Sequence, residues 1–194
     1  VYRRNTMKQL TILLDCDDTI STFMETCINK YNEIYGTNHS INEINGWYVD
    51  GIFEHGLWSI FDKTDVLQHM PIKDGALDTI KKWHDMGHKI VIVTGVTSTK
   101  AYEDKMRWVK LIGLEPYIYD VIPTRHKELI NGDIFIDDNP VYLQEWQEIR
   151  GNANKLCLLM TAQHNKDKTY DNFIRVDNWK EIDNILNILM LVVI

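Results

Sequence analysis

Short, continuous apolar runs alternate with amphipathic segments along most of the chain. Runs this short and this apolar are typical of strands that are buried on both faces of a parallel sheet. Helix-like patterns separate them, and strand–helix alternation of this kind predicts a doubly wound α/β fold. We expect the strands at residues 11–14, 89–93, 118–122, 134–136 and 156–160.

Boundary residues support the helices between these strands. Ser98 stands where a helix N-cap is expected, and Gly113 stands just past the end of the same helix. A Ser side chain can accept a hydrogen bond from the first turn, and Gly readily adopts the left-handed conformation that ends a helix. Asp74 near the start and Gly87 past the end are boundary signals of another helix. The helices are expected at residues 76–86, 98–111 and 141–149.

Residues 21–70 break this rhythm, because the segment is too long for an ordinary strand–helix connection. Its first part, residues 21–35, has a helical pattern, and residues 47–61 are rich in aromatic residues and glycine. An insertion directly after the first strand would overhang the ligand crevice of the sheet. We therefore interpret residues 21–70 as a small, mainly helical cap, and residues 7–20 and 71–194 as the catalytic core. A peripheral helical hairpin without function is the alternative.

Composition narrows the class of protein. The chain has 194 residues, 44% of them hydrophobic and 25% charged, as in one ordinary globular domain. A formal net charge of −7 argues against a nucleic-acid polymer as partner. Three cysteines without paired spacing indicate a reduced, cytoplasmic protein. We expect neither a signal peptide in residues 1–6 nor a membrane span in the apolar run 189–194, which should pack on the core or form a dimer contact.

Two aspartates follow the first strand, one residue apart. Ligands of parallel α/β sheets bind beyond the carboxyl ends of the strands, and side chains at i and i+2 of an extended segment face the same way. Asp15 and Asp17 should therefore converge, which is costly for two like charges unless a cation or a proton lies between them. Mg²⁺ takes oxygen ligands and commonly keeps substrate phosphate in its shell. The pair therefore predicts a Mg²⁺ site.

Polar residues also stand at the ends of other predicted strands. Thr94 follows the second strand, Asp137 and Asp138 follow the fourth, and Lys127 lies in the loop before it. Phosphoryl transfer uses such groups, because a carboxylate can form an aspartyl-phosphate and cations stabilise the phosphate oxygens. A second carboxylate can protonate the leaving alkoxide. Each residue alone has an ordinary structural explanation, but their order and strand-end placement favour a phosphohydrolase.

With these residues in place, the chain resembles the haloacid dehalogenase-like phosphohydrolase superfamily. The Asp-x-Asp-x-Thr motif of the superfamily is matched by residues 15–19, its Ser or Thr by Thr94, its Lys by Lys127 and its acidic pair by residues 137–138. Within the superfamily, the chain resembles the 5′(3′)-deoxyribonucleotidases along nearly its whole length. The similar stretches are residues 71–78, 105–109, 124–127, 132–138 and 177–182.

The resemblance implies roles for the carboxylates. Asp15 would be the nucleophile, and Asp17 would be the general acid and base. Asp15, the Asp17 carbonyl, Asp137 and Asp138 would hold Mg²⁺, and which member of the acidic pair binds the ion directly stays open.

The resemblance also implies a substrate site. Thr94, Gly95 and Lys127 would hold the phosphate, and Phe23 would stack on the nucleobase. The alternative to base stacking is that Phe23 is a core residue of an amphipathic helix. The chain departs from the family pattern at two of these places. It has Asp18 where the family usually has Gly, and Gly95 where the nucleotidases usually have a Ser-like residue.

We therefore expect a Mg²⁺-dependent phosphatase of nucleoside monophosphates, with deoxyribonucleotides as the main class. The same chemistry on a sugar phosphate, a phospho-accepting signalling domain and a non-hydrolysing binding protein are the alternatives. Asp17 favours the hydrolase over the signalling domain, because a general acid serves turnover and not a stable phosphorylated state. The expected partner is a small nucleotide, with no nucleic-acid polymer and no membrane, and a homodimer is left open.

Overall fold

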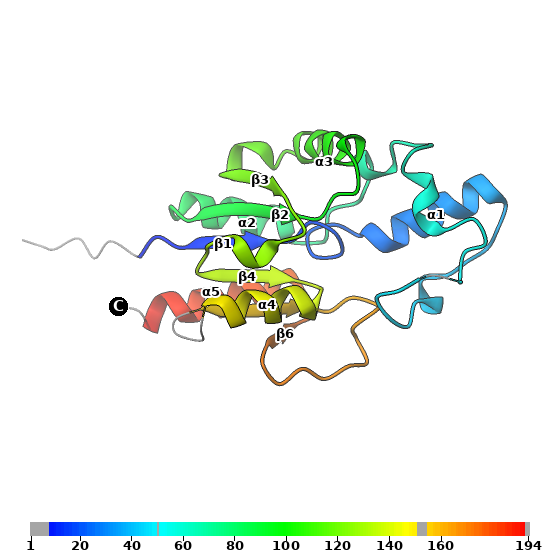
Figure 1. Ribbon diagram of the computed structural model, residues 1–194. Helices are drawn as coiled ribbons and strands as arrows, with labels where there is room; N and C mark the ends of the chain where they lie inside the picture. The colour runs from blue at the N-terminus through cyan, green and yellow to red at the C-terminus, as the bar shows by residue number, and fades with distance from the viewer. Residues whose placement is uncertain (1–7, 50, 151–154, 193–194) are drawn as a thin grey trace, which may run out of the picture.

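The computed structural model describes residues 8–49, 51–150 and 155–192 of the chain. Its centre is a six-stranded sheet with the order β3-β2-β1-β4-β5-β6, in which every neighbouring pair is parallel (Figure 1). This confirms the predicted doubly wound α/β fold. The strands are β1 (Thr11–Leu14), β2 (Lys89–Thr94), β3 (Asp120–Pro123), β4 (Ile134–Asp137), β5 (Leu156–Met160) and β6 (Ile174–Val176). The helices are α1 (Phe23–Tyr35), α2 (Ala76–Asp85), α3 (Thr99–Leu111), α4 (Pro140–Arg150) and α5 (Trp179–Val192).

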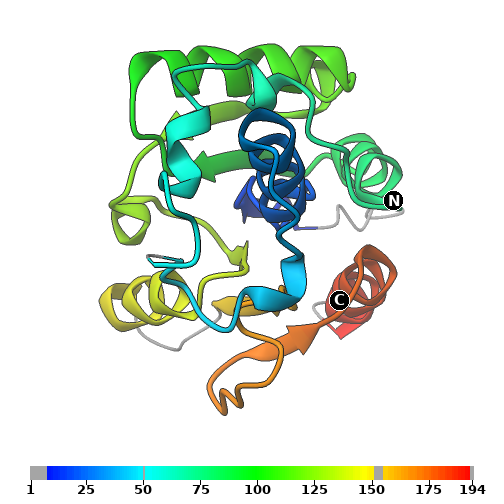
Figure 2. The ribbon, with the colours of Figure 1, turned by 90° about the vertical axis from the view of Figure 1, so that its right-hand side faces the viewer.

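Both faces of the sheet are buried, as the apolar runs predict. Ile12 and Leu14 belong to the larger core cluster, together with Trp83 of α2. Leu13, which points to the opposite face, packs in a second cluster with Trp146 of α4. Alternate residues of a strand face opposite sides of the sheet, so one short run supplies both clusters. Figure 2 shows α2 and α5 on one side of the sheet and α4 on the other.

The strand order creates a crevice between β1 and β4. The chain leaves β1 for β2 and β3 on one side, and then returns past β1 to form β4 on its other side. The connections that follow β1 and β4 therefore diverge, and ligands of open α/β sheets bind at such a point. Asp15 directly follows β1, and Asp137 is the last residue of β4. The fold thus brings both carboxylates to the crevice.

The segment from residue 21 to residue 70 lies beyond the carboxyl ends of the strands, on the right of Figure 1. The chain segments that lead into it and out of it are paired, because Ser21 and Ile72 form an isolated antiparallel bridge. Next to this bridge, the Thr22 N–H donates to the Pro71 carbonyl at 2.9 Å. The segment contains α1 and the 3₁₀ helices η1 (Ile41–Glu43), η2 (Leu57–Ile60) and η3 (Val66–Gln68). Its assignment as a separate cap stays a prediction.

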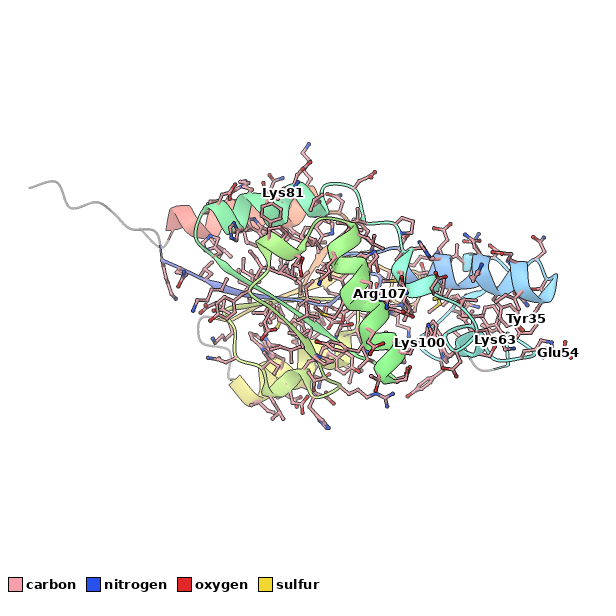
Figure 3. All side chains as sticks on the ribbon, turned by 90° about the horizontal axis from the view of Figure 1, so that it is seen from above. Tyr35, Glu54, Lys63, Lys81, Lys100 and Arg107 are labelled. Atoms are coloured by element: carbon pink, nitrogen blue, oxygen red, sulfur yellow. The ribbon has the colours of Figure 1, made fainter. Side chains whose placement is uncertain are left out.

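Hydrogen bonds also join this segment to α3. Lys100 Nζ donates to the Thr64 carbonyl at 2.7 Å and to Asp104 Oδ2 at 2.5 Å. Gln68 Nε2 donates to the other oxygen of Asp104 at 2.7 Å. Figure 3 shows Lys100 on the part of α3 that lies next to the inserted segment. These bonds hold the inserted segment against the helix that also supplies Lys105 to the crevice.

The structure corrects several predicted boundaries. β3 begins at Asp120 and not at residue 118, because Ile118 and a bend at Tyr119 connect the 3₁₀ helix η4 (Glu115–Tyr117) to the strand. α1 begins at Phe23 and not at residue 21, because Ser21 pairs with the returning chain. β6 was not predicted, since it has only three residues. Ser98 is confirmed as the N-cap residue of α3, because its Oγ accepts the N–H of Ala101 at 3.2 Å.

Two predictions on the chain ends reach beyond the described residues. α5 continues to Val192, so the apolar run 189–194 begins inside a helix. The packing of the side chains from residue 190 onward lies outside the described part, as do residues 1–6. Within the described ranges, no helix has the length and apolarity that crossing a bilayer requires.

Gly132 lies so close to the buried Leu13 that a larger residue does not fit. A Cβ on Gly132 would lie 2.6 Å from Leu13 Cγ. We expect Gly132→Ala to lower the free energy of unfolding by about 1–3 kcal/mol, the usual cost of overpacking, in urea denaturation. The control is Gly46→Ala, whose Cβ would meet only Lys168 Nζ at 4.0 Å. Equal stability of the two variants would contradict the close approach.

Candidate active site

The loop after β1 supplies the first two carboxylates of the site. The Asp15 N–H donates to the Ile136 carbonyl at 2.9 Å, which extends the pairing with β4 one residue beyond β1. This bond fixes the Asp15 backbone between the two strands, and Asp15 is only 4% exposed. Asp15 and Asp17 line the same cavity, as their spacing predicts.

Lys127 joins the first carboxylate to the acidic pair. Its ammonium group donates to Asp15 Oδ1 and, at 2.7 Å, to Asp137 Oδ2. Lys127 is 2% exposed and begins the 3₁₀ helix η5 (Lys127–Leu129). Burial alone would lower the pKa of Lys127, but the two carboxylates outweigh it and raise the pKa above its usual value. Lys127 is therefore a permanent positive charge at the centre of the site.

Lys105 of α3, which was not predicted as a site residue, holds the second carboxylate. Lys105 Nζ donates to Asp17 Oδ2 at 2.6 Å, to Thr94 Oγ1 at 2.7 Å and to the Gly95 carbonyl at 3.0 Å. Burial raises the pKa of the Asp17 carboxyl, and the Lys105 ammonium opposes this rise. The pKa of Asp17 stays above its usual value, so Asp17 holds a proton more readily than an exposed aspartate.

The two members of the acidic pair have different partners. Both oxygens of Asp137 are used, one by Lys127 and the other by the N–H of Asn139 at 2.8 Å. Among the described residues, the Asp138 carboxylate has only longer contacts, with Thr19 Oγ1 at 3.4 Å and His164 Nε2 at 3.4 Å. Burial, followed by the charges of neighbouring aspartates, raises the pKa of Asp138 well above its usual value. Asp138 is therefore the less compensated of the two charges.

A cavity of about 430 Å³ opens over these groups. Its far wall is aromatic and comes from the inserted segment, where the Phe23 ring stacks on Trp58 with centroids 5.9 Å apart. Phe61 lies 6.1 Å from Phe23 in the same cluster. Lys105 Nζ is 5.9 Å from the centroid of the Phe23 ring. The cavity thus combines a charged floor with a flat apolar wall.

The donor atoms on the floor fit a divalent cation. One oxygen each of Asp15, Asp137 and Asp138 lies within 4.8 Å of the others. Asp17 Oδ1 is also buried, and it has no hydrogen-bond partner among the described residues. An all-oxygen set of carboxylates suits Mg²⁺ better than softer metals. The residues present therefore fit the predicted ion.

The predicted phosphate residues do not all reach the cavity in the same way. Lys127 and Gly95 line it, and a Cβ added to Gly95 would meet nothing within 4 Å, so a Ser-like residue would fit there. Thr94 is 1% exposed, and its hydroxyl accepts the hydrogen bond from Lys105. Arg125 lines the cavity as well. Arg125 was not predicted as a site residue, although it lies in the stretch 124–127 that resembles the deoxyribonucleotidases.

Nearly the whole chain matches one known family. The sequence profile described as "5′ nucleotidase, deoxy (Pyrimidine), cytosolic type C protein" matches residues 8–192. The chain belongs to this family. As a member of the deoxyribonucleotidase family, it is a phosphoric monoester hydrolase of the nucleotidase type.

Individual relatives agree with the family. The chain is 26% identical to a 5′(3′)-deoxyribonucleotidase of Clostridium acetobutylicum over 181 residues, which are 90% of this chain and 93% of the relative. It is also 26% identical to a 5′(3′)-deoxyribonucleotidase of Bacillus subtilis over 124 residues, 63% of this chain and 66% of the relative. The predicted resemblance to the deoxyribonucleotidases is thereby confirmed.

Solved structures share the fold. A HAD-hydrolase of Bacillus subtilis, solved with magnesium bound, superposes with a TM-score of 0.61 at 16% identity, over 93% of this chain and 99% of that chain. A haloacid dehalogenase-like hydrolase of Burkholderia xenovorans gives a TM-score of 0.62 at 14% identity, over 95% of this chain and 99% of that one. At such identities the likeness concerns the fold alone, and it confirms the predicted haloacid dehalogenase-like architecture of this nucleotidase.

Lys127→Met should destabilise the protein strongly, because it leaves Asp15 and Asp137 buried without their cation. We expect the free energy of unfolding to fall by about 3–5 kcal/mol, in urea denaturation with a chelator present. The control is Lys110→Met, since Lys110 pairs with Glu115 on the surface and their side chains are 60% and 55% exposed. That change should cost less than about 1 kcal/mol. Similar losses in both variants would show that Lys127 is not essential to charge compensation.

Proposed function

We propose that the chain hydrolyses deoxyribonucleoside monophosphates in a Mg²⁺-dependent reaction, through an aspartyl-phosphate on Asp15. The observation that carries the proposal is the pairing of two unlike surfaces in one cavity. A floor of buried carboxylates and lysines is suited to a phosphate, and the aromatic wall is suited to a base. Membership of the deoxyribonucleotidase family supports the same substrate class.

In this proposal Asp15 attacks the phosphorus, and the ester oxygen leaves as the phosphoryl group becomes bonded to the carboxylate. The hydrogen bond from Lys127 supports this role, because it holds the Asp15 carboxylate in place at its buried position. Lys127 and Arg125 both line the cavity and would face the negative phosphate oxygens. Thr94 and Gly95 would lie beside the bound phosphate, where Lys105 donates hydrogen bonds to the hydroxyl of Thr94 and the carbonyl of Gly95.

Asp17 would donate a proton to the departing nucleoside oxygen and later accept one from the water that hydrolyses the aspartyl-phosphate. Its raised pKa supports the first role, since burial favours the protonated form. Its bond to Lys105 supports the second, because the ammonium group stabilises the carboxylate after the proton has left. One side chain can therefore serve both half-reactions.

The metal ligands in this proposal are Asp15, the Asp17 carbonyl and Asp138. Asp138 is the better direct ligand of the acidic pair, because both oxygens of Asp137 already have partners. Asp137 would then not bind the ion directly and would orient Lys127 through their hydrogen bond. When bound, Mg²⁺ would supply positive charge to the phosphate oxygens.

Two further parts of the proposal concern the setting of the enzyme. A cytoplasmic location is supported by the cysteines, since Cys16, Cys27 and Cys157 are buried and form no disulfide. A small nucleotide as partner, and not a nucleic-acid polymer, is supported by the acidic net charge of −7. A homodimer stays a prediction.

A phosphate-release screen tests the function. Deoxy- and ribonucleoside 5′- and 3′-monophosphates would be compared with hexose and pentose phosphates, each with Mg²⁺ and with excess chelator. We expect the highest kcat/KM on deoxynucleotides and no turnover with chelator. Higher kcat/KM on sugar phosphates would support the alternative substrate class, and full activity in chelator would remove the metal from the proposal.

Asp17→Asn should slow the release of poor leaving groups most. A nucleoside alkoxide needs a proton as it departs, whereas nitrophenolate is stable without one. In single-turnover experiments, we expect nucleoside release to fall by about 10²–10⁴-fold, the usual contribution of general acid catalysis, and nitrophenolate release to fall far less. Equal losses on the two substrates would exclude Asp17 as the general acid.

Phe23→Ala should affect nucleotides and spare small aryl phosphates. Stacking of a base on an aromatic ring is worth about 1–3 kcal/mol, so KM for a deoxynucleotide should rise about tenfold or more. Turnover of p-nitrophenyl phosphate should change little. Tyr119→Ala is the control, because Tyr119 is a 69% exposed aromatic residue beside β3, outside the cavity lining. Parallel losses on both substrates would make Phe23 a packing residue.

A further inference from the structure

Asp18 has a backbone conformation that residues with a side chain rarely adopt. Its φ is +51°, and among the described residues no other non-glycine residue has a positive φ. Asp tolerates the left-handed region better than most residues, because its short polar side chain can bond to nearby backbone groups. Asp18 makes such a bond through its side chain and a second bond through its carbonyl.

These bonds reach both ends of the inserted segment. Asp18 Oδ1 accepts the N–H of Met24, in the first turn of α1, at 3.1 Å. This is the task of an N-cap side chain, and Thr22 at the N-cap position makes no such bond. The Asp18 carbonyl accepts a hydrogen bond from the Lys73 ammonium, on the chain that returns from the segment. One residue of the loop that carries the nucleophile is thus bonded to the entry and to the exit of the segment.

The start of α1 carries Phe23, one of the rings of the aromatic wall. Phe23 is the first residue of α1 and directly precedes Met24, whose N–H is bonded to Asp18. The backbone bonds between the two linkers, such as Thr22 to Pro71, hold the linkers to each other. The bond from Asp18 to Met24 instead links the helix to the nucleophile loop itself. A change in this bond would move Phe23 relative to the charged floor.

We propose that Asp18 is a positioning residue, which clamps the first turn of α1 to the nucleophile loop and so sets the distance between the aromatic wall and the reacting phosphate. The effect on substrates rests on the proposed function, whereas the clamp is a property of the fold. A charge effect is the competing explanation, because the Asp18 carboxylate also lies near Asp138 and His164.

Three substitutions separate these explanations. Asp18→Gly and Asp18→Ala both remove the acceptor, but Gly relieves the positive φ and Ala does not. Asp18→Asn is the matched control, because Asn keeps an Oδ1 acceptor and tolerates the left-handed region while it removes the charge. The measurements are hydrogen exchange of the Met24 amide, KM and kcat for a deoxynucleotide, and kcat for p-nitrophenyl phosphate.

We expect Asp18→Gly and Asp18→Ala to speed exchange at Met24 and to raise the nucleotide KM, each by about 3- to 10-fold, as for the loss of an ordinary helix cap. The kcat for p-nitrophenyl phosphate should stay within about twofold, and Asp18→Asn should match the wild type in all measurements. An Asn variant as impaired as the Gly variant would overturn the clamp in favour of charge. A Gly variant that behaves like the wild type would overturn the clamp, because the positive φ of residue 18 would then suffice without the side-chain bond to Met24. If no nucleotide is hydrolysed, the proposed function fails, but exchange at Met24 still decides the clamp.

Discussion

The burial of several carboxylates at one point of the sheet is the constraint on which the site depends. Asp15 and Asp137 are almost fully enclosed at the carboxyl ends of β1 and β4, and a carboxylate in that position is costly unless it is paired. Lys127 and Lys105 supply the compensating charges from η5 and α3, segments that are far apart in the sequence. The charges meet only when β1, β4, η5 and α3 are packed together, so tertiary structure and not local sequence assembles the site.

The division between a charged floor and an aromatic wall gives each part of the chain a separate task. The strand ends and their lysines supply groups that any phosphomonoester can use, whereas the inserted segment supplies flat apolar surface. The two parts share one hydrophobic core cluster, and polar contacts such as Lys100 with Thr64 and Asp18 with Met24 also join them. These polar contacts lie on the loop after β1 and on α3, the same elements that supply Asp17 and Lys105 to the cavity.

The carboxylates could be predicted from the sequence because strand ends are local features. A buried strand followed by Asp15 and Asp17 is visible as an apolar run with two charges, and the same holds for Asp137. Lys105 could not be predicted, because a lysine inside an amphipathic helix usually lies on the solvent side, and only the packing of α3 turns it inward. The usual Gly of the family at the position of Asp18 hints at a positive φ, but the bonds of Asp18 to both linkers become visible only in the fold.

The most direct test of the account is the search for a phosphoryl group on Asp15. The Asp17→Asn variant would be mixed with p-nitrophenyl phosphate and Mg²⁺, quenched in acid within one turnover, digested and examined by mass spectrometry. Without Asp17 to activate water, the intermediate should accumulate, and the peptide that contains Asp15 should gain the mass of one phosphoryl group as nitrophenolate appears. A burst of nitrophenolate with no modified Asp15 peptide, or with the phosphoryl group on another residue, would contradict the account.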